Sequence, residues 1–375
     1  MIEIVEVQNR QQQNSFLDLP EQLHSGDPNW VPRIRASEKE LSGFAKHPFN
    51  DSARSSAFLA VMNNQPVGRI VAINNQIHNK THPGKPTGFI GFYESANDPE
   101  IAKALFEAAF DWLRTEDLHW VRGPVSPSMN YEAGLLIKGF DKPPTFMMPY
   151  NPAYYVDQWE ECGFRKTQDM FAFRGDLSMY DSATKAWAIA DQAATRFGAT
   201  FRRIDNRRFL EDVKTFLRLY NLASASTWGF LPFSENEIQF LAKELRHLII
   251  PELTSFMMVD GKTIGATFGL LDYSPIIKSI RGRLFPFGFL KILFSRRRIK
   301  KSRCMSINVL PEYQKWGLGL CLLNRYLKQG SANGIKDVEF SYVLESNHLA
   351  ASTLTNAGVE KEKIYRVYEL SLIHI

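Results

Sequence analysis

One order of secondary-structure elements is repeated along the 375-residue chain, and this repetition limits the fold more than any single motif. Residues 58–73 (FLAVMNNQPVGRIVAI) and 256–271 (FMMVDGKTIGATFGLL) each read as a β-hairpin, in which a strand opening on Phe precedes a polar turn and a second strand. After each hairpin the pattern predicts a strand, a helix, a strand, a helix and a closing strand. Self-similarity in a fixed order indicates duplication. We therefore predict an α/β fold with mixed sheets in two tandem domains, over residues 1–178 and 186–375.

The second copy carries an insert, residues 273–303, that holds the basic character of the chain. It contains ten basic residues and no acidic one, and without it the net charge changes from +5 to −5. Phe285, Phe287 and Phe289 lie there in an apolar stretch that has lysine and arginine residues on both sides. This arrangement favours contact with an anionic membrane surface. Packing within the protein or in a homodimer is the alternative. Its consecutive aliphatic residues disfavour RNA, and DNA is not an expected partner.

The composition is that of a soluble protein, with 44% hydrophobic and 23% charged residues. The N-terminal residues show no basic segment followed by an apolar one, and the apolar stretch LFPFGFLKILF is too short to span a bilayer. Cys162, Cys304 and Cys321 have neither paired nor metal-type spacing. We expect a cytoplasmic protein that has no disulfide bonds and binds no metal. If it contacts lipid, we expect it to bind peripherally to the inner face of the membrane.

The stretch NVLPEYQKWGLGLCLL, residues 308–323, places Gly317 and Gly319 between a strand-like run and a helical run, with Gln314 just ahead. A strand, a turn with exposed amides and a helix N-terminus together make an anion site. Glycines let the backbone approach a ligand closely. The full phosphate loop Gly-x-x-x-x-Gly-Lys-Ser/Thr and the three-glycine dinucleotide fingerprint are absent, which disfavours Mg²⁺ chemistry and NAD. The turn therefore predicts a pyrophosphate site.

This stretch resembles the acyl-CoA pyrophosphate loop of the GCN5-related N-acyltransferase (GNAT) superfamily: a strand, Gln/Arg-x-x-Gly-x-Gly/Ala and a helix. The resemblance covers residues 200–375 and extends more weakly to 1–175, where ESANDPEIAK (94–103) has neither the Gln nor the glycine pair. The chain thus resembles a tandem acyltransferase with a degenerate first copy, a layout shared by N-myristoyltransferase and the Fem-type transferases. GRLFPFG (282–288), followed by a basic run, is similar to a little-characterised bacterial group of double-domain acyltransferases, some tied to ceramide formation.

The resemblance implies a set of residues that hold acyl-CoA or acetyl-CoA through its pantetheine arm, its pyrophosphate and its thioester end. They are Val309 and Leu310 for the pantetheine, Gln314 at the loop entrance, Lys315, Trp316, Gly317, Leu318, Gly319 and Leu320 for the pyrophosphate, and Asn347 near the thioester.

The catalytic acid and base are less clearly marked. The family often places a Tyr seven residues after that Asn as general acid, but Leu354 occupies this position. Tyr365 is our candidate acid, with Tyr342 and Tyr368 as alternatives. An ammonium must lose a proton before it attacks a thioester, so a base is also needed. Glu345 is the first choice.

Two further bases are Asp272 and, by analogy with N-myristoyltransferase, the C-terminal carboxylate of Ile375. In the first copy Asn130, Tyr131 and Glu132 stand in a loop too polar for a core, and we expect them to face the cleft between the domains.

The resemblance implies an N-acyltransferase that moves an acyl group from a CoA or carrier thioester to an amine, such as that of a membrane-associated long-chain base. Two alternatives stay open. One is a Fem-like transferase that uses aminoacyl-tRNA. The other is a non-catalytic acyl-CoA-binding protein, which the missing tyrosine at position 354 favours.

Overall fold

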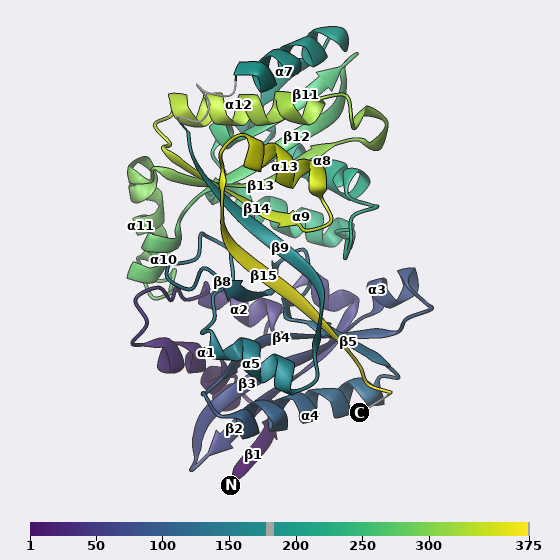
Figure 1. Cartoon of the computed structure of the whole chain (residues 1–375). Coiled ribbons are helices and arrows are strands. Elements are labelled where there is room, and N and C mark those ends of the chain that lie inside the picture. The colour runs from purple at the N-terminus through teal and green to yellow at the C-terminus, as the bar shows by residue number, and fades with distance from the viewer. Residues whose placement is uncertain (178–183, 374–375) are drawn as a thin grey trace. The chain divides into compact units, whose positions relative to one another are not determined.

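The computed structural model of the protein describes residues 1–177 and 184–373 (Figure 1). The chain divides into two compact units. The first comprises Met1–Met170, Ser274–Leu290 and Lys363–Ile375, and the second comprises Phe171–Tyr273 and Lys291–Glu362.

The elements of the first unit form a mixed sheet with helices packed against it. They are β1 (Ile2–Glu6), α1 (Arg10–His24), α2 (Arg35–Leu41), η1 (Pro48–Asp51), β2 (Ala53–Met62), β3 (Gln65–Asn75), α3 (Gln76–Thr81), β4 (Thr87–Ser95), α4 (Pro99–Thr115), β5 (Trp120–Gly123), β6 (Val125–Ser126), β7 (Glu132–Ala133), β8 (Leu135–Lys138), α5 (Tyr154–Glu161), α10 (Ser274–Ser279) and parts of β9 (Arg165–Asp176) and β15 (Glu360–Ser371).

The first-unit sheet has the strand order β1-β2-β3-β4-β5-β15, and β8 also pairs with β15. All its pairs are antiparallel except β4 and β5, which run parallel from Thr87↔Trp120 to Phe89↔Arg122. Helix α4 packs against β2 and β3 with an apolar face that includes Leu105 and Phe106, both almost fully buried. Helical spacing of apolar residues explains why this segment folds as a helix on the sheet.

The second unit repeats this plan with its own helices. Its elements are α7 (Thr184–Arg196), β10 (Thr200–Arg203), η2 (Asn206–Arg208), α8 (Phe209–Ala223), α9 (Glu235–Glu244), η3 (Leu245–His247), η4 (Pro251–Leu253), β11 (Thr254–Val259), β12 (Lys262–Leu271), most of α11 (Gly288–Ser295), η5 (Arg296–Arg298), β13 (Lys301–Val309), η6 (Pro311–Tyr313), α12 (Leu318–Ala332), β14 (Asp337–Leu344), α13 (His348–Asn356) and the remaining parts of β9 and β15.

The second-unit sheet has the order β9-β14-β13-β12-β11-β10, and β13 and β14 run parallel. Helix α12 packs beside α7 (Figure 1). Leu318 and Leu322 of α12 join Ala193 of α7 and Met257 of β11 in one buried cluster. This cluster anchors the first turn of α12, so the glycine turn before it starts from a fixed helix end.

The predicted α/β class and both hairpins are confirmed, as β2–β3 and β11–β12. The compact units differ from a simple cut of the chain into residues 1–178 and 186–375. Residues 274–290 belong to the first unit, where the Arg35 N–H donates to the Gly282 carbonyl at 3.0 Å. The C-terminal strand belongs there too, because Tyr368–Ser371 pair with β5. The stretch between the two predicted domains, residues 179–185, lies largely outside the described residues.

No helix in residues 1–177 and 184–373 combines the length and apolarity needed to cross a membrane. Over the same residues no group of three or more His, Cys, Asp and Glu side chains could hold a metal ion. Within the basic insert, Phe285 and Phe287 are 78% and 74% exposed. Its contact with a membrane stays a prediction.

Candidate functional site

The turn between β13 and α12 has the backbone shape that an anion site requires. After η6 the chain passes through Gln314 and enters α12 at Leu318. Lys315 and Gly317 both adopt left-handed conformations, with φ of 66° and 83°. Left-handed residues within a turn rotate neighbouring N–H groups toward one side, which forms a concave surface that attracts anions. Gly317 therefore stands where positive φ is needed, as glycine allows.

The N–H groups of this turn are available to a ligand. Within the described part of the chain, the backbone N–H groups of residues 315–319 donate to no protein acceptor, and the first one engaged is that of Leu320, at 3.0 Å from the Gly317 carbonyl. Helix α12 has no acidic residue in its first turn, and no side chain of the described residues caps it. A Cβ atom added at Gly319 would meet no atom within 4 Å. Unpaired N–H groups, the helix dipole and open space together suit a phosphate group.

The corresponding helix of the first unit is closed to anions. At the start of α4 the Asp98 carboxylate accepts a hydrogen bond from the Glu100 N–H at 3.0 Å, and Pro99 occupies the first helical position. Glu100 adds a second negative charge in the same turn. Because its own carboxylates occupy this helix end, a phosphate group there would meet negative charge. The degeneracy of the first copy stays a prediction.

Strands β13 and β14 separate just before the glycine turn. Their parallel pairing runs from Lys301↔Asp337 to Cys304↔Phe340, while β13 continues to Val309 and β14 to Leu344. Residues 305–309 of β13 therefore extend beyond the paired region. Two strands that diverge in this way expose main-chain groups along their facing edges, to which an extended ligand can bind.

Leu310 and Gln314, two of the residues predicted to bind the cofactor, form hydrogen bonds with other groups of the protein. The Leu310 N–H donates to the Ile264 carbonyl at 2.9 Å, and the Leu310 carbonyl accepts from the Tyr313 N–H at 2.9 Å. The Gln314 amide donates to the Val309 carbonyl at 2.9 Å. Gln314 therefore ties the turn back to β13. Because hydrogen-bonding directions alternate along a strand, the Val309 N–H faces away from β12, toward the gap.

Trp316 of the turn stacks with an arginine, Arg196, that the sequence patterns did not point to. Trp316 is 48% exposed, and the Arg196 guanidinium lies over its ring, 4.7 Å from the centroid. Arg196 is the last residue of α7, which packs beside α12. The turn thus has a positive charge at its side as well as N–H donors. No spacing rule connects Arg196 with the glycine pair, since the two segments meet only in the fold.

The predicted catalytic residues of the second unit lie at the end of β14. Glu345 is half-buried in the turn that follows the strand. Asn347 caps α13, where its side-chain oxygen accepts from the Ala350 N–H at 3.1 Å. Asp272, the second-choice base, is buried with Lys301 at 3.6 Å. Glu345 and Asn347 therefore share one end of the sheet, and their catalytic roles stay predictions.

The candidate acids lie on two strands: Tyr342 is on β14 itself, three residues before Glu345, whereas Tyr365 and Tyr368 are on β15. Tyr365 belongs to the first unit, where it is fully buried on β15 opposite Leu136 of β8. Leu354, at the position where the family often has Tyr, is buried in α13. The carboxylate of Ile375 lies outside the described residues. The role of Tyr365 as the acid stays a prediction.

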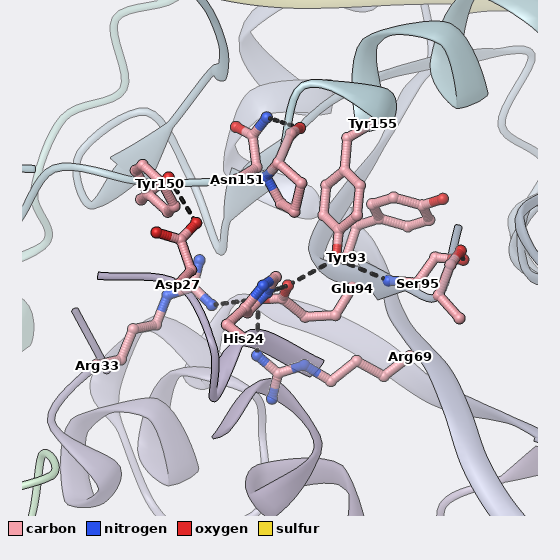
Figure 2. A network of polar contacts seen from close by, with 12 residues as sticks. His24, Asp27, Arg33, Arg69, Tyr93, Glu94, Ser95, Tyr150, Asn151 and Tyr155 are labelled. Carbon is pink, nitrogen blue, oxygen red and sulfur yellow. Dashed lines mark hydrogen bonds and ion pairs between the residues drawn. The ribbon is translucent and has the colours of Figure 1, made fainter. Parts of the chain in front are cut away.

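A buried polar cluster in the first unit was not foreseen (Figure 2). At its centre is Glu94, near the end of β4. One of its carboxylate oxygens contacts His24 Nε2 at 2.7 Å and accepts from the Tyr155 hydroxyl at 2.9 Å. The other lies 3.5 Å from Arg69 and 3.6 Å from Arg33.

Burial alone would raise the pKa of Glu94, but His24, Arg69 and Arg33 outweigh it and lower the pKa to about 2. Glu94 is therefore ionised at neutral pH.

Comparisons with known proteins give the chain two relatives over nearly its whole length and solved structures with the same fold. No family model matches it. It is 31% identical over 370 residues to Protein YghO of Escherichia coli, covering 96% of this chain and 93% of that protein. It is also 31% identical over 380 residues to a protein of Caulobacter vibrioides named bacterial ceramide synthase, covering 99% of this chain and 98% of that protein. Among solved structures, a tandem GNAT protein from the clavulanic acid biosynthesis pathway matches with a TM-score of 0.57 and 12% identity over 99% of each chain.

These similarities extend over nearly the whole chain, and the fold and the glycine turn agree with them. The chain belongs to one family with Protein YghO of Escherichia coli and the Caulobacter protein named bacterial ceramide synthase, and it has the fold of tandem GNAT proteins.

Proposed function

We propose that this protein transfers an acyl group from acyl-CoA, bound at the 315–320 turn, to the amine of a long-chain amphiphile. The observation that carries the proposal is the free row of N–H groups at residues 315–319 beside the open space at Gly319. The diphosphate of CoA is an anion of the size that a helix N-terminus binds. The relative named bacterial ceramide synthase supports an amphiphilic acceptor, since a ceramide is an amide of a long-chain amine.

In the reaction, the nitrogen lone pair attacks the thioester carbonyl carbon, the C–N bond forms, the C–S bond breaks and the thiolate takes up a proton. The protein must remove a proton from the ammonium before attack, for which Glu345 is the candidate base. Binding both substrates side by side supplies most of the acceleration, because it converts a bimolecular step into a unimolecular one.

A non-catalytic acyl-CoA-binding protein is the second candidate, and the buried Leu354 is the observation that favours it. A transfer assay separates the two. Purified protein with palmitoyl-CoA and a C18 long-chain amino alcohol should release free CoA and form the amide in equal amounts, measured by thiol titration and mass spectrometry. Tight CoA binding without amide formation, across acyl-CoAs of several chain lengths and amines of several classes, would support the non-catalytic reading instead.

A further inference from the structure

The exposed phenylalanines of the protein all lie in one short segment. The 27 phenylalanines of the chain are all among the described residues, and only Phe285, Phe287, Phe289 and Phe294 are exposed, at 78%, 74%, 41% and 80%. Leu293 between them is 38% exposed. Single exposed apolar side chains are common on protein surfaces, but five within ten residues indicate an interaction site. We call residues 281–298 the aromatic segment.

The first part of the aromatic segment is a closed loop that carries Phe285 at its exposed end. The Phe289 N–H donates to the Leu284 carbonyl at 2.9 Å, which closes residues 284–289. Just before this loop, Gly282 packs so closely on the backbone of Arg33 that an added Cβ atom would overlap the Arg33 carbonyl oxygen. The ring centroids of Phe285 and Phe289 are 6.0 Å apart, so the loop and the start of α11 share one apolar surface.

Helix α11 extends this apolar surface. Phe289 and Leu293 are four residues apart and therefore lie on one side of the helix. The same spacing places Phe294 after Leu290, next to that pair. Ile292, on the opposite side, is only 5% exposed. The helix is thus apolar on its exposed side as well as on its buried side, which is unfavourable in water and suits a second apolar environment.

The charge of the aromatic segment is positive on both sides of its phenylalanines. Four of its cations are exposed and, over residues 1–177 and 184–373, form no ion pair: Arg283, Lys291, Arg297 and Arg298. Arg281 has one loose contact, with Glu21 at 3.6 Å. Residues 273–303 contain no acidic side chain. Exposed cations beside apolar rings fit a surface that is anionic outside and apolar inside, as an anionic bilayer is.

We propose that the aromatic segment docks the protein on an anionic lipid bilayer, with the four phenylalanines in the head-group region and the unpaired cations on lipid phosphates. A second copy of the chain fits this surface less well, because it would bring the same cations against these, and like charges across an interface are costly. Docking does not depend on the proposed reaction, but a bilayer is where a long-chain acceptor would dissolve.

The test measures co-sedimentation of the purified protein with lipid vesicles. The wild type should bind phosphatidylcholine vesicles that contain phosphatidylglycerol at least about tenfold more tightly than vesicles of phosphatidylcholine alone. Phe285→Ser combined with Phe287→Ser should lower the affinity for the anionic vesicles about tenfold or more, because two aromatic rings are lost from the contact.

A second pair of substitutions tests the charge. Arg297→Gln combined with Arg298→Gln should reduce the preference for anionic vesicles about fivefold or more and leave the affinity for neutral vesicles unchanged.

Leu222→Ser combined with Leu349→Ser is the matched control, since these side chains are 61% and 69% exposed but lie on α8 and α13. This variant should bind vesicles as the wild type does. Thermal unfolding and CoA binding of each variant report separately on folding and on the proposed function. Should the phenylalanine variant fail to fold, the arginine variant decides.

Two results would overturn the inference even if CoA binds. One is equal affinity of the wild type for the two kinds of vesicle, or of the wild type and the phenylalanine variant for the anionic ones. The other is a wild-type dimer in analytical ultracentrifugation that the phenylalanine substitutions convert to a monomer, without any preference for anionic vesicles. The aromatic segment would then be a contact between copies of the chain. Loss of CoA binding with intact vesicle binding would instead defeat only the proposed function.

Discussion

Replacing Gly319 with Asp should lower the affinity for CoA about 100-fold or more without destabilising the protein. A carboxylate at this position would stand where the diphosphate is proposed to lie, and two like charges in a confined site repel. The fold has room for the side chain, because a Cβ atom at Gly319 meets nothing within 4 Å and the residue is not left-handed. An acidic residue in the first turn of a helix is in fact stabilising, by about 0.3–1 kcal/mol.

Gly319→Asp should thus bind CoA more weakly while its stability stays the same or rises. A simple folding defect would lower both the affinity and the stability. Gly84→Asp is a suitable control, since Gly84 also has no atom within 4 Å of an added Cβ and lies in the first unit. The measurements are CoA titration by calorimetry and thermal unfolding. If Gly319→Asp binds CoA as tightly as the wild type, the diphosphate is not at this turn.

Replacing Arg69 with Met should lower the free energy of unfolding by about 3–5 kcal/mol, because it leaves buried carboxylates without their cation. Arg69 is fully buried on β3, where it contacts Glu38 at 2.7 Å and donates to the Phe16 carbonyl at 2.8 Å. Its guanidinium also lies over the Phe16 ring, 4.7 Å from the centroid. Urea unfolding, followed by fluorescence and circular dichroism, measures the loss.

Two variants show whether the charge is the cause. Arg69→Met combined with Glu38→Gln should recover part of the lost stability, because one of the stranded carboxylates is gone. Arg218→Met, which breaks the exposed pair between Arg218 and Glu235 at 2.9 Å, should leave the urea midpoint where it is in the wild type. A loss from Arg69→Met no larger than that from Arg218→Met would show that the buried cluster contributes little to the fold.

Much of the second unit could be predicted because its signals are local. Gly317 and Gly319 mark a turn whose shape depends on a few neighbouring residues, and apolar spacing fixes α12 after it. The sequence also predicted that Gln314 lies at the entrance of the turn, but it did not predict the hydrogen-bond partner of this side chain. The Gln314 amide donates to Val309 within the protein, a choice that depends on how the turn folds back on β13.

The polar cluster of the first unit escaped prediction for the opposite reason. His24, Arg69 and Glu94 come from a helix and two strands, and no spacing rule relates them. Each one alone reads as a surface residue, since charged side chains are rarely buried unless paired. Glu132 was singled out only because its loop is too polar for a core, without any indication of its partner Arg33.

Tyr365 shows a third limit. The sequence places it in the last strand of the second copy, but β15 contributes residues to both units and Tyr365 belongs to the first. Strand exchange of this kind depends on long-range pairing, here with β8 and β5, and periodicity along the strand cannot reveal it.

Hydrogen exchange of the wild-type protein, followed by mass spectrometry with and without CoA, tests the central claim most directly. In residues 1–177 and 184–373 no acceptor meets the N–H groups of residues 315–319, so these groups should exchange fast in the free protein. Once CoA is bound they should exchange at least about tenfold more slowly, whereas the capped start of α4 should not change. Unchanged exchange at residues 315–319 under saturating CoA, or protection at the start of α4 instead, would contradict the assignment of the acyl-donor site to this turn.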